Sequence, residues 1–151
     1  MKAKLNKKAF YTLSFTWGII LTLIGIIVGL IILIKDSIKD KKLHLPKKWG
    51  HCFYIETGNY WGGLNLGVVF IVDKTNSVFA KNHEMGHAIQ NCYFGPFMLL
   101  VTAASAIRYH YRNYLRKKDP AIKLPDYYSI WFEAQANKLG KELKDWLDQS
   151  N

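Results

Sequence analysis

Five consecutive residues, His83-Glu84-Met85-Gly86-His87, combine side chains that can bind a metal ion and activate water. On an α-helix, residues four apart lie on one face, so His83 and His87 can bind the same ion. Glu84 follows the first histidine and can take a proton from a water molecule on that ion. A catalytic zinc site takes three protein ligands and leaves one position open, so this pattern requires a third ligand elsewhere in the chain.

The third ligand has to come from another histidine or an acid, and the local sequence favours Glu133. The other candidates include His44, His51, His110 and Glu56. Glu133 is the one acid in the apolar segment 130–137, where a carboxylate on a helix is costly unless it is paired or metal-bound. We therefore predict that Glu133 is the third ligand, with a salt bridge to a lysine or arginine as the alternative. Asn137, one turn further on, is predicted to hydrogen-bond a metal-binding histidine.

The two motifs together resemble a known family of enzymes. The HExxH helix, followed downstream by E-x-x-A-N from Glu133 to Asn137, is similar to the gluzincin branch of the HExxH metallopeptidases. The membrane-bound CAAX-prenyl-protease and heat-shock membrane protease type is the most similar, and its second helix carries E-x-x-A-D. The resemblance covers residues 64–140 at most. This chain departs from the family in having Asn137 for the aspartate, one clear spanning segment and a short length.

The resemblance implies a set of roles. His83, His87 and Glu133 would bind Zn²⁺, and Glu84 would be the general base that hydrolyses a peptide bond with zinc-activated water. A strand ahead of the motif helix, Leu66 to Val72, would hold an extended peptide or protein substrate along its edge. The residue that stabilises the developing oxyanion stays open among Tyr109, His110, Tyr111, Tyr127 and Tyr128.

Residues 10–34 form a run of 25 residues without a charge. As a helix this run is about 37 Å long, enough to cross a hydrocarbon core of about 30 Å. It is longer than the apolar part of a signal peptide and ends at charged residues, so we predict a single uncleaved transmembrane helix. Gly18, Gly25 and Gly29 either allow another helix to approach closely or are routine glycines of a membrane helix.

The positive charge of the chain is concentrated on both sides of that run. Residues 1–9 carry four lysines, and residues 35–48 carry six lysines and two aspartates, which together account for +8 of the net charge of +10. This distribution favours anionic lipid headgroups over nucleic acid as the partner. The excess of lysines after the helix favours a cytoplasmic C-terminal domain. Nothing in the sequence indicates an oligomeric state.

The remaining segments predict an α+β fold. Residues 52–55 and 66–72 are β-prone and are interpreted as a β-hairpin. The motif helix is expected over 78–93, where Gly95-Pro96 follow it. An apolar helix over 97–107, buried, interfacial or re-entrant, continues as a basic tail to residue 118, and Asp126 is expected to cap a C-terminal ligand helix that ends near Asp148.

These elements predict one membrane-anchored domain. The expected organisation is a basic N-terminal flank (1–9), a transmembrane helix (10–34), a basic juxtamembrane linker (35–50) and a small zincin-like domain (51–151). Cys52 and Cys92 lack metal-ligand spacing and are interpreted as ordinary thiols. The main alternative to a zinc peptidase is a non-catalytic, membrane-anchored zinc-binding or interaction protein.

Overall fold

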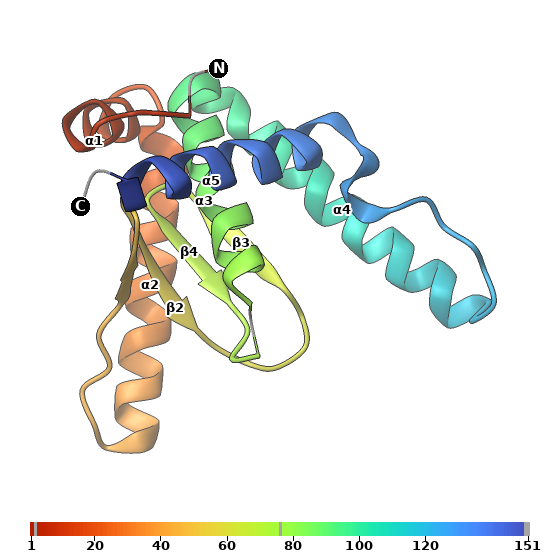
Figure 1. Ribbon diagram of the computed structural model, residues 1–151. Helices are drawn as coiled ribbons and strands as arrows, with labels where there is room; N and C mark the ends of the chain where they lie inside the picture. Colours follow the sequence, from red (N-terminus) through yellow and green to blue (C-terminus); the bar gives the residue numbers. More distant parts are fainter. Residues whose placement is uncertain (2, 76, 150–151) are drawn as a thin grey trace.

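The computed structural model describes all residues except Lys2, Asn76, Ser150 and Asn151, and within that part of the chain it is an α+β fold (Figure 1). The helices are α1 (Lys7–Phe15), α2 (Ile19–Asp40), α3 (Val78–Phe94), α4 (Met98–Lys118) and α5 (Trp131–Gln149), with short 3-10 helices η1 (Gly95–Phe97) and η2 (Tyr127–Ser129). The strands are β1 (Lys47–Trp49), β2 (Cys52–Glu56), β3 (Gly63–Leu66) and β4 (Val69–Val72). The α+β class is confirmed.

The sheet has the order β1-β2-β4-β3, and this order corrects the predicted hairpin. Strands β2 and β4, which were expected to pair as a hairpin, run parallel, with Tyr54 opposite Phe70. The actual hairpin joins β3 to β4 and turns at Gly67, which has a φ of +75°. The side-chain oxygen of Asn65 accepts a hydrogen bond from the Gly67 amide at 2.9 Å, so a turn interrupts what reads as one apolar run. As a result β3, and not β4, forms one edge of the sheet.

The predicted membrane helix over 10–34 is divided into two helices. Helix α1 ends at Phe15 and α2 begins at Ile19. At the break, the buried side chain of Asn91 on α3 donates a hydrogen bond to the Gly18 carbonyl at 3.1 Å, and a Cβ on Gly18 would overlap that side chain. Helix α1 then joins the core through Phe10, which is fully buried.

Helix α2 is long and apolar enough to cross a membrane. It also takes in residues 35–40 of the predicted linker, whereas residues 47–49 of that linker form β1 and pair with β2. Its glycines face the sheet and not another helix: a Cβ on Gly25 would overlap Leu66, and Gly29 lies against Ile55 and Val69. The opposite face of α2 leaves Ile20, Leu23, Ile27, Leu30, Ile31 and Ile34 exposed.

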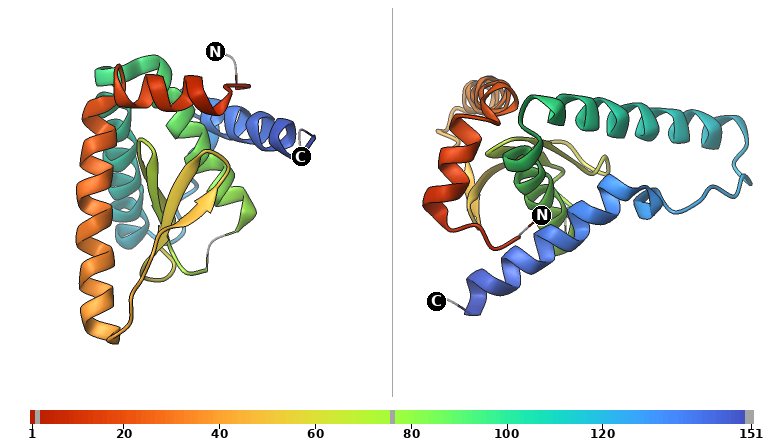
Figure 2. Two further views of the ribbon diagram at one scale, coloured as in Figure 1. Left: turned by 90° about the vertical axis from the view of Figure 1, so that its left-hand side faces the viewer. Right: turned by 90° about the horizontal axis from the view of Figure 1, so that it is seen from above.

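The sheet lies between helices on both of its faces. Helix α2 packs against β3 and β4 on one face, and α3 packs against the same strands on the other (Figure 2). All four residues of β4 are buried as a result. The predicted boundaries of the motif helix α3 are confirmed to within one residue, with Ser77 capping it through a hydrogen bond to the Ala80 amide at 3.2 Å.

Helices α3 and α5 cross in close contact, and two glycines allow the contact. A Cβ on Gly86 would overlap the Ala136 carbonyl, and a Cβ on Gly140 would overlap the Asn82 carbonyl. This close packing explains the glycine at position 86, inside the motif. Gly140 is the second contact point. The crossing holds the N-terminal part of α5 against the middle of α3.

Helix α4 joins the predicted apolar run and its basic tail into one rod that leads away from the sheet (Figure 1). Its first residue, Met98, is buried, but Leu100, Ile107, Tyr111 and Tyr114 are exposed along one face. Asp126 caps η2, where its side chain accepts a hydrogen bond from the Tyr128 amide, and α5 begins only at Trp131, five residues after Asp126. Leu139 and Leu143 are the buried apolar residues in the second half of α5.

Candidate metal centre

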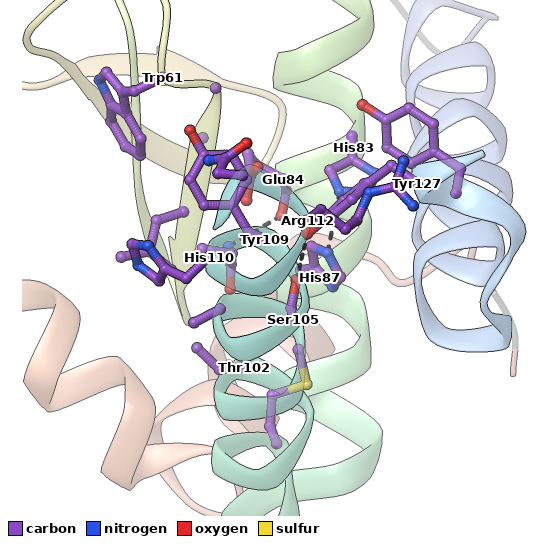
Figure 3. Close-up of a pocket in the computed structure, with 18 of the residues that line it drawn as sticks. Trp61, His83, Glu84, His87, Thr102, Ser105, Tyr109, His110, Arg112 and Tyr127 are labelled. Atoms are coloured by element: carbon purple, nitrogen blue, oxygen red, sulfur yellow. Dashed lines mark hydrogen bonds between the residues drawn. The ribbon is translucent and has the colours of Figure 1, made fainter. Parts of the chain in front are cut away.

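Three predicted ligand residues from two helices converge on one point. His83 and His87 lie one turn apart on α3, and Glu133 reaches them from the first turn of α5. All three side chains are buried. Figure 3 shows the two imidazoles beside Glu84 on α3, with Ser105 of α4 and Tyr127 of η2 around them. The glycine-mediated contact between α3 and α5 is what brings the acid, 46 positions after His87, to the histidines.

The ligand atoms form a nearly regular triangle. The two Nε2 atoms of His83 and His87 are 3.2 Å apart, and Glu133 Oε2 lies 3.1 Å from the first and 3.4 Å from the second. Zinc with bonds of about 2.0–2.1 Å in a tetrahedron places neighbouring ligand atoms about 3.3 Å apart. The three distances therefore match the spacing of three ligand atoms around a tetrahedral metal ion such as zinc.

Hydrogen bonds at the far side of each ring indicate which nitrogen carries the proton. His83 Nδ1 lies 2.7 Å from Asn137 Oδ1, and His87 Nδ1 lies 2.7 Å from Gln90 Oε1. The Gln90 amide nitrogen donates to the Phe132 carbonyl at 2.8 Å, so its oxygen has to face His87. An amide oxygen only accepts, so each Nδ1 is the donor, and in the neutral form of each ring the Nε2 lone pair points at the shared centre. The contact predicted for Asn137 is present.

Glu133 completes the centre as a carboxylate anion. Burial raises the pKa of its carboxyl, but contact with His83, His87 and Ser105 outweighs burial and holds that pKa well below its ordinary range. Its Oε1 accepts hydrogen bonds from the hydroxyls of Ser105 and Tyr127, whereas its buried Oε2 has no hydrogen-bond donor in the described part of the chain. No lysine or arginine among the described residues pairs with Glu133, so the salt-bridge alternative is not observed. Two lone pairs and one anionic oxygen that face one another could hold a metal ion between them.

Glu84 lies beside the three ligands and against the edge of the sheet. A Cβ on Gly63 of β3 would overlap its carboxylate, so a larger residue at this position would displace the Glu84 side chain. Burial raises the pKa of Glu84 to about 7; the charge of His83 and the backbone amide of Asn65 oppose the rise, and the charge of Glu133 adds to it. A carboxyl group with a pKa near neutrality can both accept and return a proton, which is the property required of a general acid–base.

A cavity of about 530 Å³ opens over the centre. Its walls are residues 61–65 at the edge strand β3, the motif of α3, one side of α4, and the two tyrosines of η2 (Figure 3). The strand expected to hold a substrate, 66–72, is not available for this role, because β4 is paired on both sides. The strand edge at the cavity belongs instead to β3.

The aromatic residues around the cavity differ in position. Of the predicted candidates for stabilising an oxyanion, Tyr109, His110, Tyr127 and Tyr128 line the cavity, whereas Tyr111 is 60% exposed elsewhere. The Tyr127 hydroxyl is already engaged, at 2.8 Å from Ser105 Oγ and 3.3 Å from Glu133 Oε1. The ring of Tyr128 packs edge-on against His83, with 5.1 Å between centroids.

Three residues of the site, Gln90, Ser105 and Arg112, were not predicted from the sequence. Gln90 could have been predicted, because it lies three positions after His87 and therefore on the same face of α3. Ser105 and Arg112 lie on α4 and enter the site only because of the path that this helix takes. Comparison of the chain with protein-family models, curated proteins and solved structures finds no match. The function therefore has to be argued from the geometry of the site.

Proposed function

We propose that this protein is a membrane-anchored, zinc-dependent peptidase. The observation that carries the proposal is the triangle formed by His83 Nε2, His87 Nε2 and Glu133 Oε2, with sides of 3.1–3.4 Å and all three electron pairs directed inward. Two imidazole nitrogens and one carboxylate oxygen are a ligand set that zinc uses in hydrolytic sites. The single long apolar helix α2 supports the membrane anchor.

The residues around the centre support hydrolysis over simple storage of the metal. Bound at this triangle, zinc would supply an activated water molecule and polarise the carbonyl of the substrate. Glu84 would take the proton of that water through its carboxylate and pass it to the leaving amine. The edge of β3, which lies against Glu84 at Gly63, offers main-chain groups to an extended peptide. Asn137 and Gln90 would keep both imidazoles in the tautomer that binds the metal.

Metal analysis and proteolysis of the purified full-length protein in detergent test the proposal together. We expect about one zinc per chain, and hydrolysis of unfolded protein that stops with a chelator and returns with zinc. Glu84→Gln, which keeps the side-chain shape, should retain the zinc and lose hydrolysis. His87→Ala should lose both.

The two other possible results are informative. Zinc retained by the wild type, with no hydrolysis of any unfolded substrate, would favour the alternative of a non-catalytic zinc-binding membrane protein. Hydrolysis that survives both zinc removal and Glu84→Gln would refute the mechanism, because neither the metal nor the base would then be required.

A further inference from the structure

The end of the cavity formed by α4 carries basic side chains. Arg112 and Arg116 line it together with His110 and Asn113. Arg112 is the unusual member because it is only 7% exposed. Its guanidinium lies 5.9 Å from the centre of the Tyr127 ring, and Figure 3 shows the two side chains next to each other in the cavity wall.

Arg112 is buried without an acidic partner. No carboxylate in the described part of the chain lies within 4 Å of its guanidinium, so the Tyr127 ring is its main charge-related contact. Burial lowers the pKa of Arg112, the charges of Arg108 and Arg116 lower it further, and the more distant Asp126 opposes them. A buried guanidinium in an already positive environment is costly unless an anion joins it.

The net charge of the cavity also favours an anionic ligand. If zinc binds as proposed above, its two positive charges balance the carboxylates of Glu84 and Glu133. The guanidinium groups of Arg112 and Arg116 then leave the cavity with an excess positive charge. A ligand that fills this cavity is therefore favoured when it carries a negative charge at the α4 end.

We propose that Arg112 binds a carboxylate of the substrate peptide, either an acidic side chain or the free C-terminus. The guanidinium fork matches a carboxylate through two parallel hydrogen bonds. Tyr127 sets the distance, because its hydroxyl contacts the Glu133 carboxylate while its ring contacts Arg112. The bound carboxylate therefore lies within a few residues of the cleaved bond. This inference rests on the proposed peptidase function, which supplies the peptide.

The test combines cleavage with binding. A digested proteome offered as a peptide library identifies the cleaved bonds. Matched peptides are then made in three forms: one with a glutamate and an amidated C-terminus, one neutral with a free C-terminus, and one neutral and amidated. In the wild type we expect kcat/KM to be roughly tenfold or more higher for one charged form than for the neutral amidated form. The form that shows the preference identifies the source of the carboxylate.

The variant Arg112→Gln should reduce this preference at least tenfold, and Arg112→Lys should restore part of it through its charge. The control Lys117→Gln removes a positive charge from an exposed position of α4 outside the cavity and should keep the preference. Zinc content shows whether each variant is folded. A wild type without a charge preference would overturn the inference, as would an Arg112→Gln variant that slows all three peptides equally.

A binding measurement separates failure of this inference from failure of the peptidase. Titration calorimetry with zinc-loaded Glu84→Gln requires no turnover, and it uses the same three charged and neutral forms made on one unfolded peptide sequence that is fixed beforehand, whether or not a cleaved bond is known. Charge-selective binding that depends on Arg112, without hydrolysis by the wild type, would retain the carboxylate site and reject the peptidase. Hydrolysis without charge-selective binding would retain the peptidase and reject the carboxylate site. The absence of both would reject both.

Discussion

The two sides of the candidate metal centre are built differently. On the side formed by α3 and α5, the backbones are in contact through Gly86 and Gly140, and the polar groups bind one another. The side formed by α4 packs mainly at its beginning, near Met98, and reaches the centre through single side chains such as Ser105. This difference indicates that the close crossing of α3 and α5 sets the positions of the three ligand atoms. Substitutions on α4 should therefore have little effect on a bound metal.

The largest expected effect of a single methyl group is at the crossing. Gly86→Ala would drive a Cβ into the Ala136 carbonyl and push α5, with Glu133, away from the histidines. We expect a loss of roughly 2–4 kcal/mol in stability, together with the loss of stoichiometric zinc. Thermal unfolding and metal analysis check both. The control is Ala104→Val at an exposed position of α4, where we expect less than about 1 kcal/mol, mostly from the lower helix propensity of valine.

The next effect concerns the buried carboxyl group of Glu84 in the metal-free protein. The pKa of Glu84 rises from an ordinary 4.5 to about 7 on folding, so the folded state holds its proton more tightly than the unfolded state. The contribution of Glu84 to stability is then fully present below about pH 4.5 and is lost as the pH rises through 7. At pH 8, Glu84→Gln should stabilise the chelator-treated protein by roughly 2–3 kcal/mol. Unfolding measured at several pH values would contradict this if the variant gained nothing.

Zinc affinity should respond to the hydrogen bonds on the far side of each ring. Gln90→Leu removes the acceptor of His87 Nδ1, and Asn137→Leu removes that of His83 Nδ1. Each should weaken zinc binding by roughly 10–100-fold. Asn137→Asp supplies a charged acceptor and should bind zinc more tightly than the wild type. Competition with a zinc-sensitive chelating dye measures all three, and an unchanged affinity in both leucine variants would show that the rings are oriented by packing alone.

The smallest effect is expected from the α4 side. Ser105→Ala removes one hydrogen bond to Glu133 Oε1, but the Tyr127 hydroxyl, at 3.3 Å from the same oxygen, remains. We expect zinc affinity to fall less than about tenfold, since a single neutral-donor bond to a charged group contributes about 1.5–3 kcal/mol when no other donor replaces it. An effect as large as that of Gln90→Leu, in the same dye assay, would mean that α4 controls the metal as strongly as the crossing does.

The same contrast explains how much of the site was predictable. The motif helix, Glu133 and Asn137 were found because each carries its signal locally: ligand spacing, a lone acid among apolar residues, and an amide one turn away. The contribution of α4 has no local sequence signal. Ser105 takes part only because the path of α4 in the fold brings it to Glu133. The zinc, the hydrolysis and the resemblance to a peptidase family stay predictions that the experiments above address.

The fold was predictable in class and in its helices, but not in its pairing. Strands β2 and β4 were recognised as β-prone, yet their parallel pairing depends on a turn at Gly67 hidden inside an apolar run. The break between α1 and α2 depends on Asn91, 73 positions after Gly18, which no local pattern reveals. Long-range polar contacts of this kind decide details that composition and periodicity leave open.

The way α2 lies on the sheet has a consequence for where the protein can act. Gly25 and Gly29 bring α2 into direct contact with Leu66 and Val69, so α2 is packed into the folded domain and is not a flexible tether. A bilayer that takes up α2 would therefore set the height of the β3 edge above or within the lipid. For the peptidase proposed above, this would limit cleavage to substrate chains presented at that depth.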